Sequence, residues 1–486
     1  MRRKRLLKNA VLLTATGFLL RGLGMVLRVY MSGKVGGVGM GLYQLINSVY
    51  FLCLTLAQAG VSVTVSRRCA ERLAAHDGAG AYRVLKSAVL VALITGCAAG
   101  AALFFGAGAV SAVWIADPRA ALSLRALAPS LPLCALSAVY SAYFVAEKNV
   151  IYGCEAQIAE QLTRMGGAWA ALSLLVGKGP GVTLAAVCLT TTLAEAVSCL
   201  WLRTAFHRTH IRPRDTRADA AGLIIKESAP VAAGRLVSSA LHTAENMLVP
   251  SAAAICEGSR EAAMGAFGEL KGMALPLLLF PSSFLSALST LLVPEVAGGD
   301  SGRIAARSTR LTLEFGFAAA GVFFLFGGEL GALIYKSAGA GRYLKALSVI
   351  VPFMYLDGIC DGLLKGMGLQ VRRLVHGCID SGSRILLIAL LLPRYGMDGF
   401  LAVMIFSNVL SAVLGYALLA RKARIKGALF AFLSPAARCA GSAFLTKFLT
   451  PDSAILTKTL LGTALFCLIF ALSGAAAGAA EQKIQK

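Results

Sequence analysis

The chain has few charged residues and lacks the motifs that usually carry catalysis. Only 15% of its 486 residues are Asp, Glu, Lys or Arg, against about 25% in an average soluble domain. The sequence holds no P-loop, no HExxH metal motif and no convincing nucleophile elbow. Its 12 cysteines are scattered singly without a CxxC pair, so neither a disulfide framework nor a metal site is expected. These absences argue against a soluble protein and against an enzyme, and no cofactor is expected.

Long hydrophobic stretches take the place of those motifs. Hydrophobic residues make up 57% of the chain and fall into stretches of about 20, the length of a helix that crosses a bilayer. The sequence therefore predicts an all-α, polytopic membrane protein with about 14 transmembrane helices. The predicted spans are 9–32, 40–66, 84–110, 122–146, 155–177, 181–203, 223–250, 264–293, 311–335, 345–367, 373–394, 398–420, 428–449 and 455–478.

The excess of basic residues reports membrane topology. The chain has 47 Lys and Arg against 24 Asp and Glu, and they gather in short connections between the apolar stretches. Because cytoplasmic loops are enriched in Lys and Arg, we expect a multi-pass protein of the cell membrane with both termini in the cytoplasm. The basic start MRRKRLLKN precedes an apolar stretch too long for a signal peptide, which predicts a retained first span. The net positive charge of the chain is therefore explained by topology, and no nucleic acid partner is expected.

Part of the sequence repeats at a constant interval. RALAPSLPL at 125–133 aligns with KALSVIVPF at 345–353, which places Pro132 on Pro352. The same interval relates two acid-x-x-x-Arg pairs, which are Glu160 with Arg164 and Asp380 with Arg384. Side chains four residues apart share a helix face, so each pair is predicted to be a structural ion pair.

The repeat predicts a division into two pseudo-symmetric six-helix lobes. The first lobe covers 1–222 and the second 223–427, while 428–486 adds two transmembrane helices and a cytoplasmic tail. Six spans are an even number, so both copies keep one orientation and are related by a pseudo-two-fold axis along the membrane normal. Duplicated halves of this kind are typical of transporters that open alternately to each side of the membrane.

The first span carries two arginines where hydrocarbon would be expected. Arg21 and Arg28 are seven residues apart and fall on one helix face together with Gly17 and Gly24. An arginine in a membrane is costly unless it lines a hydrated cavity, so this face is predicted to attract an anion. Snorkelling of the side chains to the membrane interface is the alternative, and it suits Arg28 better than Arg21.

Further ionisable residues lie in the predicted spans without an obvious partner on their own helix. Arg235 occupies the first span of the second half, and two arginines facing each other across the pseudo-two-fold would form a cleft suited to phosphate. The carboxylates in this group are candidate cation sites or countercharges to the arginines. They are Asp357, Asp361 and Glu245. Pairing of Asp357 and Asp361 with basic residues of neighbouring helices is the alternative.

Several blocks resemble the stage V sporulation protein B family. They are LLRGLGMVLRVYMSGKVGGVGMGLYQLINSVYFL, GVSVTVSRRCAER, GMALPLLLFPSSFLSALSTLLVPEVA and LLKGMGLQVRRLVHGCIDSGSRILLIALLLPRYGMDGFLAVMIFSN. That family consists of polysaccharide-flippase-like members of the multidrug/oligosaccharidyl-lipid/polysaccharide (MOP) exporter superfamily, related to lipid II flippases. The resemblance implies a V-shaped fold shared with multidrug and toxin extrusion (MATE) transporters.

The resemblance also implies a function. It implies that the chain flips an undecaprenyl-diphosphate-linked oligosaccharide, a lipid II-like precursor of cell-wall or spore-cortex peptidoglycan, from the cytoplasmic to the outer leaflet. Arg21 and Arg28 match first-helix basic residues that hold the diphosphate, and Arg235 and Lys271 match cavity positions approximately. The expected partners are the lipid-linked sugar, membrane lipids and the wall-synthesis machinery, with Na⁺ or H⁺ as coupling ion.

Two other functions compete with this interpretation. A cation-coupled multidrug antiporter of the same superfamily would need an acidic, aromatic-lined cavity, whereas the first span offers arginines. A non-transporting scaffold of a wall-synthesis complex would have little need of the repeat. The sequence leaves open the sugar, the coupling ion, the link to sporulation and the oligomeric state.

Overall fold

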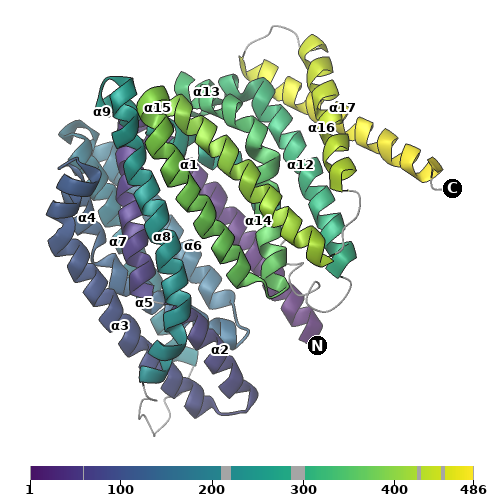
Figure 1. Cartoon of the computed structure of the whole chain (residues 1–486). Coiled ribbons are helices and arrows are strands. Elements are labelled where there is room, and N and C mark those ends of the chain that lie inside the picture. The colour runs from purple at the N-terminus through teal and green to yellow at the C-terminus, as the bar shows by residue number, and fades with distance from the viewer. Residues whose placement is uncertain are drawn as a thin grey trace. The chain divides into compact units, whose positions relative to one another are not determined.

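A computed structural model describes the chain as a succession of long α-helices (Figure 1). It describes residues 2–58, 60–209, 221–285, 301–423, 428–449 and 455–484. The helices are α1 (Arg2–Gln58), α2 (Val61–Ala74), α3 (Gly78–Ala109), α4 (Ala120–Leu127), α5 (Ser130–Ala146), α6 (Ile151–Leu175), α7 (Pro180–Thr209), α8 (Ala221–Glu257), α9 (Arg260–Phe267), α10 (Leu275–Leu279), α12 (Ser301–Leu330), α13 (Ala338–Leu347), α14 (Val351–Gly366), α15 (Gln370–Ala423), α16 (Ala428–Leu449) and α17 (Ile455–Ile484).

The predicted class of all-α membrane protein is confirmed. Within the described ranges, nine helices are long and apolar enough to cross a membrane. Two of them, α1 and α15, each consist of two helices joined at a kink, at Gly36 and Gly396, and both kinks fall in the gap between two predicted spans. Both glycines have positive φ, 67° and 54°, a conformation that glycine adopts at little cost. The count of 14 transmembrane helices stays a prediction, and residues 286–293 of the span 264–293 lie outside the described residues.

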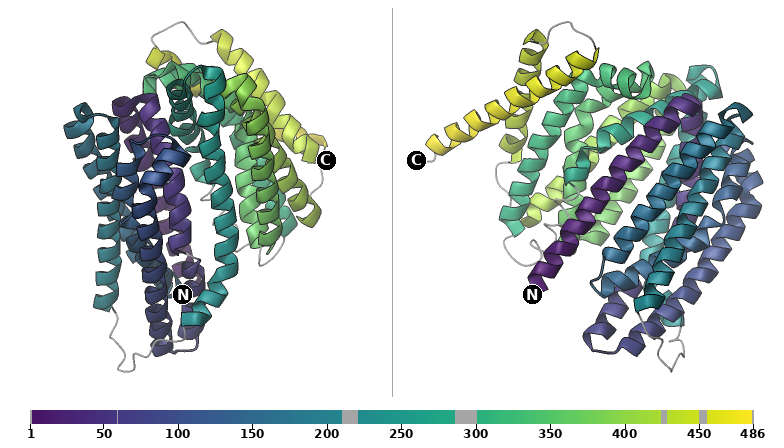
Figure 2. Two further views of the ribbon diagram at one scale, coloured as in Figure 1. Left: turned by 60° about the vertical axis from the view of Figure 1, so that its left-hand side comes forward. Right: turned by 180° about the vertical axis from the view of Figure 1, so that it is seen from behind.

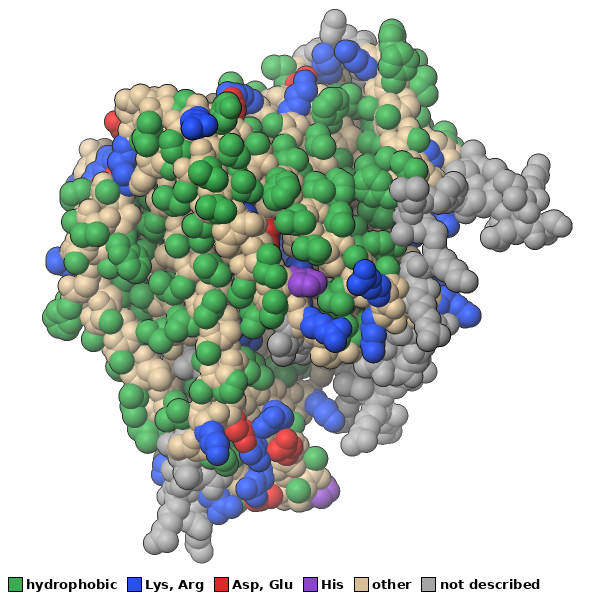
Figure 3. All heavy atoms as spheres, viewed as in Figure 1, with side chains coloured by type: hydrophobic (Ala, Val, Ile, Leu, Met, Phe, Trp, Pro, Cys, Tyr) green, Lys and Arg blue, Asp and Glu red, His purple; other side chains and the backbone are tan. Residues whose placement is uncertain are grey.

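The helices form two compact units, Met1–Leu248 and Val249–Lys486. The division falls in the second half of α8, whereas the sequence suggests a boundary at the start of that helix, at 222. The first half of α1 is the long purple helix in the right-hand view of Figure 2. Figure 3 shows charged side chains gathered over α2 at the bottom of the view, with mainly hydrophobic side chains over the helices above it. This distribution suits helices whose middle parts lie in hydrocarbon.

An aromatic cluster closes one end of the first unit. Phe206 of α7 is 2% exposed and packs edge-to-face on Tyr143 of α5, with ring centroids 5.1 Å apart. Tyr82 of α3 stacks on the ring of Phe206, with ring centroids 6.1 Å apart. At this end Asp77 caps α3, because its carboxylate accepts a hydrogen bond from the backbone N–H of Gly80 at 2.7 Å. That bond holds the pKa of Asp77 below its usual value.

The core of the second unit lies between α12, α14 and α15, which run side by side (Figure 1). Its fully buried members include Cys360 and Leu363 of α14 and Leu419 of α15. Tyr355 of α14 donates its hydroxyl to the carbonyl of Leu278 at 2.6 Å, which fixes α14 against α10. The helices α14 and α15, which carry Asp357 and Arg373, are therefore held by apolar packing.

The internal repeat reappears in local backbone geometry. A π-helical turn over Val110–Ile115 ends at Ala116, which has φ 51°. A second π-helical turn over Gly331–Tyr335 ends at Lys336, which has φ 52°. The interval between Ala116 and Lys336 is the one that separates Pro132 from Pro352. Left-handed conformations are uncommon outside glycine, so their recurrence at this interval supports a true duplication.

A close contact between two helices recurs at the same interval. A Cβ added to Gly96 of α3 would lie 2.7 Å from Cα of Pro132, and one added to Gly316 of α12 would lie 2.9 Å from Cα of Pro352. In each unit the backbone of one helix thus approaches a proline of the next where only glycine fits. These contacts align the two helices of each copy in the same register.

We predict that Gly96→Ala and Gly316→Ala each lower the melting temperature of the protein in detergent. The new methyl group would overlap backbone atoms, and overpacking of this kind costs about 1–3 kcal/mol. Gly106→Ala is the matched control in α3, because a Cβ there meets no atom within 4 Å. Equal melting of Gly96→Ala and Gly106→Ala would show that the proline contact does not require glycine.

Candidate functional site

The first half of α1, which carries Arg21 and Arg28, lies against α6. Asn9 donates to the carbonyl of Lys148 at 2.7 Å, just before α6 begins, and the hydroxyl of Tyr30 lies 3.0 Å from that of Ser173. Arg21 is exposed and Arg28 is partly exposed. Among the described residues, neither arginine forms an ion pair or hydrogen bond. The face predicted from the sequence therefore carries uncompensated positive charge.

The glycines beside these arginines leave space on the helix surface. A Cβ added to Gly17 would meet no atom within 4 Å, and one added to Gly24 would meet only the amide nitrogen of Gln161 at 3.9 Å. A side chain at either position would project next to a guanidinium group. The small residues thus leave room for a ligand to approach the two positive charges.

Arg235 lies on α8, in the part of that helix that belongs to the first unit. Two bonds tie this part of α8 to α1: Thr243 donates to the carbonyl of Ser48 at 3.0 Å, and Asn246 donates to the Ser48 hydroxyl at 2.9 Å. Arg235 is exposed and has no ion-pair partner within the described part of the chain. Glu245, by contrast, is 1% exposed, and its carboxylate lies 3.8 Å from Nδ1 of His242.

A charged cluster in the first unit joins α6 and α7. Nη2 of Arg164 lies 2.5 Å from Oε1 of Glu160 and 3.3 Å from Oε1 of Glu195. The pair Glu160–Arg164 is the one predicted from the four-residue spacing, and the structure adds Glu195 of α7 as a second carboxylate. Two carboxylates share one guanidinium, so the cluster carries one negative charge when all three groups are ionised.

A second charged cluster joins α14 and α15. Nη2 of Arg373 lies 2.5 Å from Oδ2 of Asp357, and Nε of the same residue lies 3.5 Å from Oδ1 of Asp361. Lys365 forms a further pair with Asp361 at 2.6 Å, and the Ser411 hydroxyl donates to Asp357 at 3.0 Å. Two acidic and two basic groups balance each other here. The structure thus gives both aspartates basic partners, which is the alternative that the sequence left open.

The other predicted residues of the second unit, Asp380, Arg384 and Lys271, also contact neighbouring side chains. Asp380 lies 3.7 Å from Arg384, the pair expected from the repeat, and accepts a hydrogen bond from Ser407 at 2.5 Å. The ammonium group of Lys271 lies 5.5 Å from the ring centroid of Phe400, a cation–π distance. Each of these groups is held by neighbours within its own unit.

The sequence did not predict the ion pairs that join different helices. Arg373 is 14% exposed and is the hub of the second cluster, yet it lies on the helix that follows the one carrying Asp357. Arg438 of α16 pairs with Glu314 of α12, and Arg68 of α2 pairs with Glu227 of α8. Charge within apolar stretches was the available signal, but the pairing depends on which helices pack together.

We predict that Arg373→Met destabilises the protein by roughly 3 kcal/mol, because it leaves two partly buried carboxylates without their shared partner. The double variant Arg373→Met/Asp357→Asn should recover part of the loss, since one negative charge is removed with the positive one. Unfolding of the purified protein in detergent, followed by melting temperature, measures both effects.

The matched control is Arg342→Met. Arg342 pairs with Asp398 at 2.5 Å, but both side chains are more than 60% exposed, so the loss should stay below about 1 kcal/mol. If Arg373→Met and Arg342→Met destabilise the protein equally, the buried cluster has no special structural role.

Comparison with known proteins matches this chain to one sequence family. Residues 6–296 match the family described as polysaccharide biosynthesis protein. Stage V sporulation protein B of Bacillus subtilis (strain 168) is 26% identical over 431 residues, covering 85% of this chain and 83% of that protein. Sporulation protein YkvU of the same organism is 22% identical over 389 residues, covering 76% and 85%.

Solved structures with the same fold cover almost all of the chain. Lipid II flippase MurJ in an inward closed conformation matches 96% of this chain and 98% of its own with a TM-score of 0.76, at 13% identity. An inward-facing MATE family transporter of the MOP superfamily matches 85% and 98% with a TM-score of 0.67, at 16% identity. The fold is therefore the one that flippases and transporters of this superfamily share.

Proposed function

The chain belongs to the polysaccharide biosynthesis protein family, and from this premise we propose that it flips a lipid-linked sugar diphosphate across the cell membrane. The proposed substrate is an undecaprenyl-diphosphate-linked oligosaccharide, a lipid II-like precursor of cell-wall or spore-cortex peptidoglycan. Movement runs from the cytoplasmic to the outer leaflet by alternating access. The relatives named for sporulation and the fold shared with a lipid II flippase support this choice.

One observation carries the proposal. Arginines in the apolar helices fall into two groups, and one group is already compensated: Arg164, Arg373 and Arg438 each contact a carboxylate. Arg21 and Arg28 do not contact one among the described residues. A guanidinium binds phosphate oxygens through two parallel hydrogen bonds, so a diphosphate is a fitting counterion for this helix face.

Arg235 and Lys271 are the other two residues proposed to bind the diphosphate, and they differ in how accessible they are to it. Arg235 is exposed, like Arg21, and so is accessible to a ligand. Lys271 lies over Phe400, so it contributes to binding only if its ammonium group reaches the ligand from that position. The diphosphate is therefore assigned first to Arg21 and Arg28.

The carboxylates have a different proposed role. Asp357 and Asp361 act as countercharges to Arg373 and Lys365, because both are engaged within one balanced cluster. A coupling cation would more readily be drawn to a cluster with excess negative charge, such as Glu160 and Glu195 around Arg164. The choice between Na⁺ and H⁺ is left to measurement.

We predict that Arg21→Ala and Arg28→Ala each slow flipping at least about ten-fold, the cost of losing one charge-assisted bond to phosphate. The measurement uses proteoliposomes that contain labelled undecaprenyl-diphosphate sugar and follows the label reaching the opposite leaflet, with and without a Na⁺ or H⁺ gradient. Lys178→Ala is the control, because it removes an exposed positive charge from the turn between α6 and α7.

Three outcomes would overturn the assignment. If wild type and Arg21→Ala flip the lipid at equal rates, the first-helix arginines do not hold the diphosphate. If the wild type moves no lipid but exchanges organic cations against ions, the multidrug antiporter replaces the flippase. A scaffold is indicated if neither substrate moves while wall synthesis in cells still requires the protein.

A further inference from the structure

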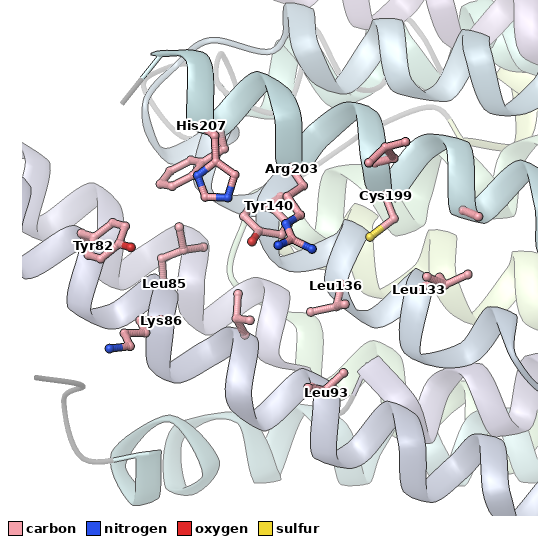
Figure 4. Close-up of a pocket in the computed structure, with 14 residues that line it drawn as sticks. Tyr82, Leu85, Lys86, Leu93, Leu133, Leu136, Tyr140, Cys199, Arg203 and His207 are labelled. Atoms are coloured by element: carbon pink, nitrogen blue, oxygen red, sulfur yellow. The ribbon is translucent and has the colours of Figure 1, made fainter. Parts of the chain in front are cut away.

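A groove on the first unit has charged and apolar ends. It has a volume of about 920 Å³ and lies between α3, α5 and α7. Of the 14 described residues that line it, three carry basic or imidazole side chains, Lys86, Arg203 and His207, and none is acidic. Figure 4 shows Tyr82, Lys86 and His207 toward one end and Leu133 and Cys199 toward the other. The groove is therefore amphipathic along its length.

Along all three helices the lining residues change from polar to apolar in the same direction. The lining changes from Lys86 to Leu93 along α3 and from Arg203 to Ala196 along α7, seven residues in each case. Along α5 it changes from Tyr140 to Leu133, again over seven residues. At 1.5 Å per residue, each helix contributes an apolar wall about 10 Å long below a polar rim.

The polar rim lies at the charged end of the unit. α7 ends at Thr209 and α3 begins at Gly78, beside α2, where charged side chains of both signs gather. Phe206 and its stacked neighbour Tyr82 form an aromatic layer there, as is common at the level of lipid headgroups. Toward the apolar end, Leu93 is 42% exposed and Leu200 is 62% exposed.

We propose that this groove binds an anionic phospholipid of the surrounding membrane. The phosphate lies at the rim marked by Lys86, Arg203 and His207, and one acyl chain follows the aliphatic wall toward Leu93 and Leu133. Basic pockets between transmembrane helices bind anionic headgroups in this way. The groove lies within the first unit and is lined by none of Arg21, Arg28 and Arg235, so the inference does not depend on the proposed substrate.

The charge of the headgroup determines which lipid is preferred, and burial of the acyl chain adds to its affinity. Lys86, Arg203 and His207 are the titratable side chains with basic character among the 14 described lining residues, so a phosphatidylglycerol headgroup is attracted to the rim more strongly than a zwitterionic headgroup. Glycerol phosphate is also an anion but lacks the chains, so it loses the free energy gained from each buried methylene group. An anionic phospholipid is the occupant that satisfies both ends of the groove.

The test is photo-crosslinking in nanodiscs of phosphatidylcholine that contain phosphatidylglycerol with a diazirine on its acyl chain. Label mapped by peptide mass spectrometry is expected on the groove segments of α3, α5 and α7. Each cation contributes about five-fold, so Lys86→Ala/Arg203→Ala should reduce labelling by about 25-fold. Arg203→Lys should restore most of the loss, because it keeps the charge.

Two further variants separate groove binding from general effects. Arg208→Ala removes an exposed charge five residues further along α7 that does not line the groove, and it should leave labelling unchanged. Val89→Trp fills the apolar wall without changing charge and should reduce labelling, with melting temperature confirming that each variant is folded. Glycerol phosphate should not compete.

Several results would overturn the proposal. Equal labelling by diazirine phosphatidylcholine would show that the rim does not select charge. Equal loss in Arg203→Ala and Arg208→Ala would show that any basic residue at that end suffices. Displacement by undecaprenyl diphosphate at far lower concentration than by phosphatidylglycerol would assign the groove to that lipid instead.

Discussion

An arginine among apolar helices is tolerated only when a carboxylate, a phosphate or water compensates its charge, and the arrangement of charged side chains in both units follows from this constraint. Where the chain supplies its own carboxylate, as for Arg164 and Arg373, the arginine joins two neighbouring helices. Where the described residues supply none, as for Arg21 and Arg28, a bound phosphate is the proposed compensation. The same sequence feature thus has a structural role in the first case, and a binding role is proposed in the second.

Much of the fold could be predicted from the sequence because hydrophobic length is a local signal. Apolar stretches of about 20 residues and the basic connections between them were enough to predict an all-α membrane protein. The kinks of α1 and α15 at Gly36 and Gly396 lie in the gaps between predicted spans, whereas the positive φ of these two glycines was not predictable, because it is a property of the backbone at single residues. Helix ends are set by such local details, whereas helix existence is set by the whole stretch.

The candidate site was less predictable, since ion pairing between helices depends on which helices pack together. Pairs on one helix, such as Glu160 with Arg164, follow from four-residue spacing. The partner of Glu195 and the hub role of Arg373 come from neighbouring helices, and no spacing in the sequence indicates them. The amphipathic groove was also missed, because its gradient appears only when three helices are aligned.

The repeat shows which parts of the architecture were kept and which were changed. Backbone features recur at the repeat interval, including the glycine–proline contacts and the left-handed ends of the π-helical turns. Charge does not recur in the same way: Glu195 corresponds to Gly415, and Arg373 corresponds to Gly153. A Cβ on Gly415 would lie 3.5 Å from Oδ1 of Asp357, so this glycine leaves space beside the charged cluster of the second unit.

This exchange of glycine and charge explains how two copies of one scaffold acquire different electrostatics. The cluster around Arg164 has two carboxyl groups for one guanidinium, and Arg21 and Arg28 have no carboxylate partner among the described residues, whereas the cluster of the second unit has two acidic and two basic groups. Backbone contacts that align helices tolerate little change, because a methyl group at Gly96 or Gly316 would overlap a proline. Charge diverges between the copies at other positions, as between Glu195 and Gly415.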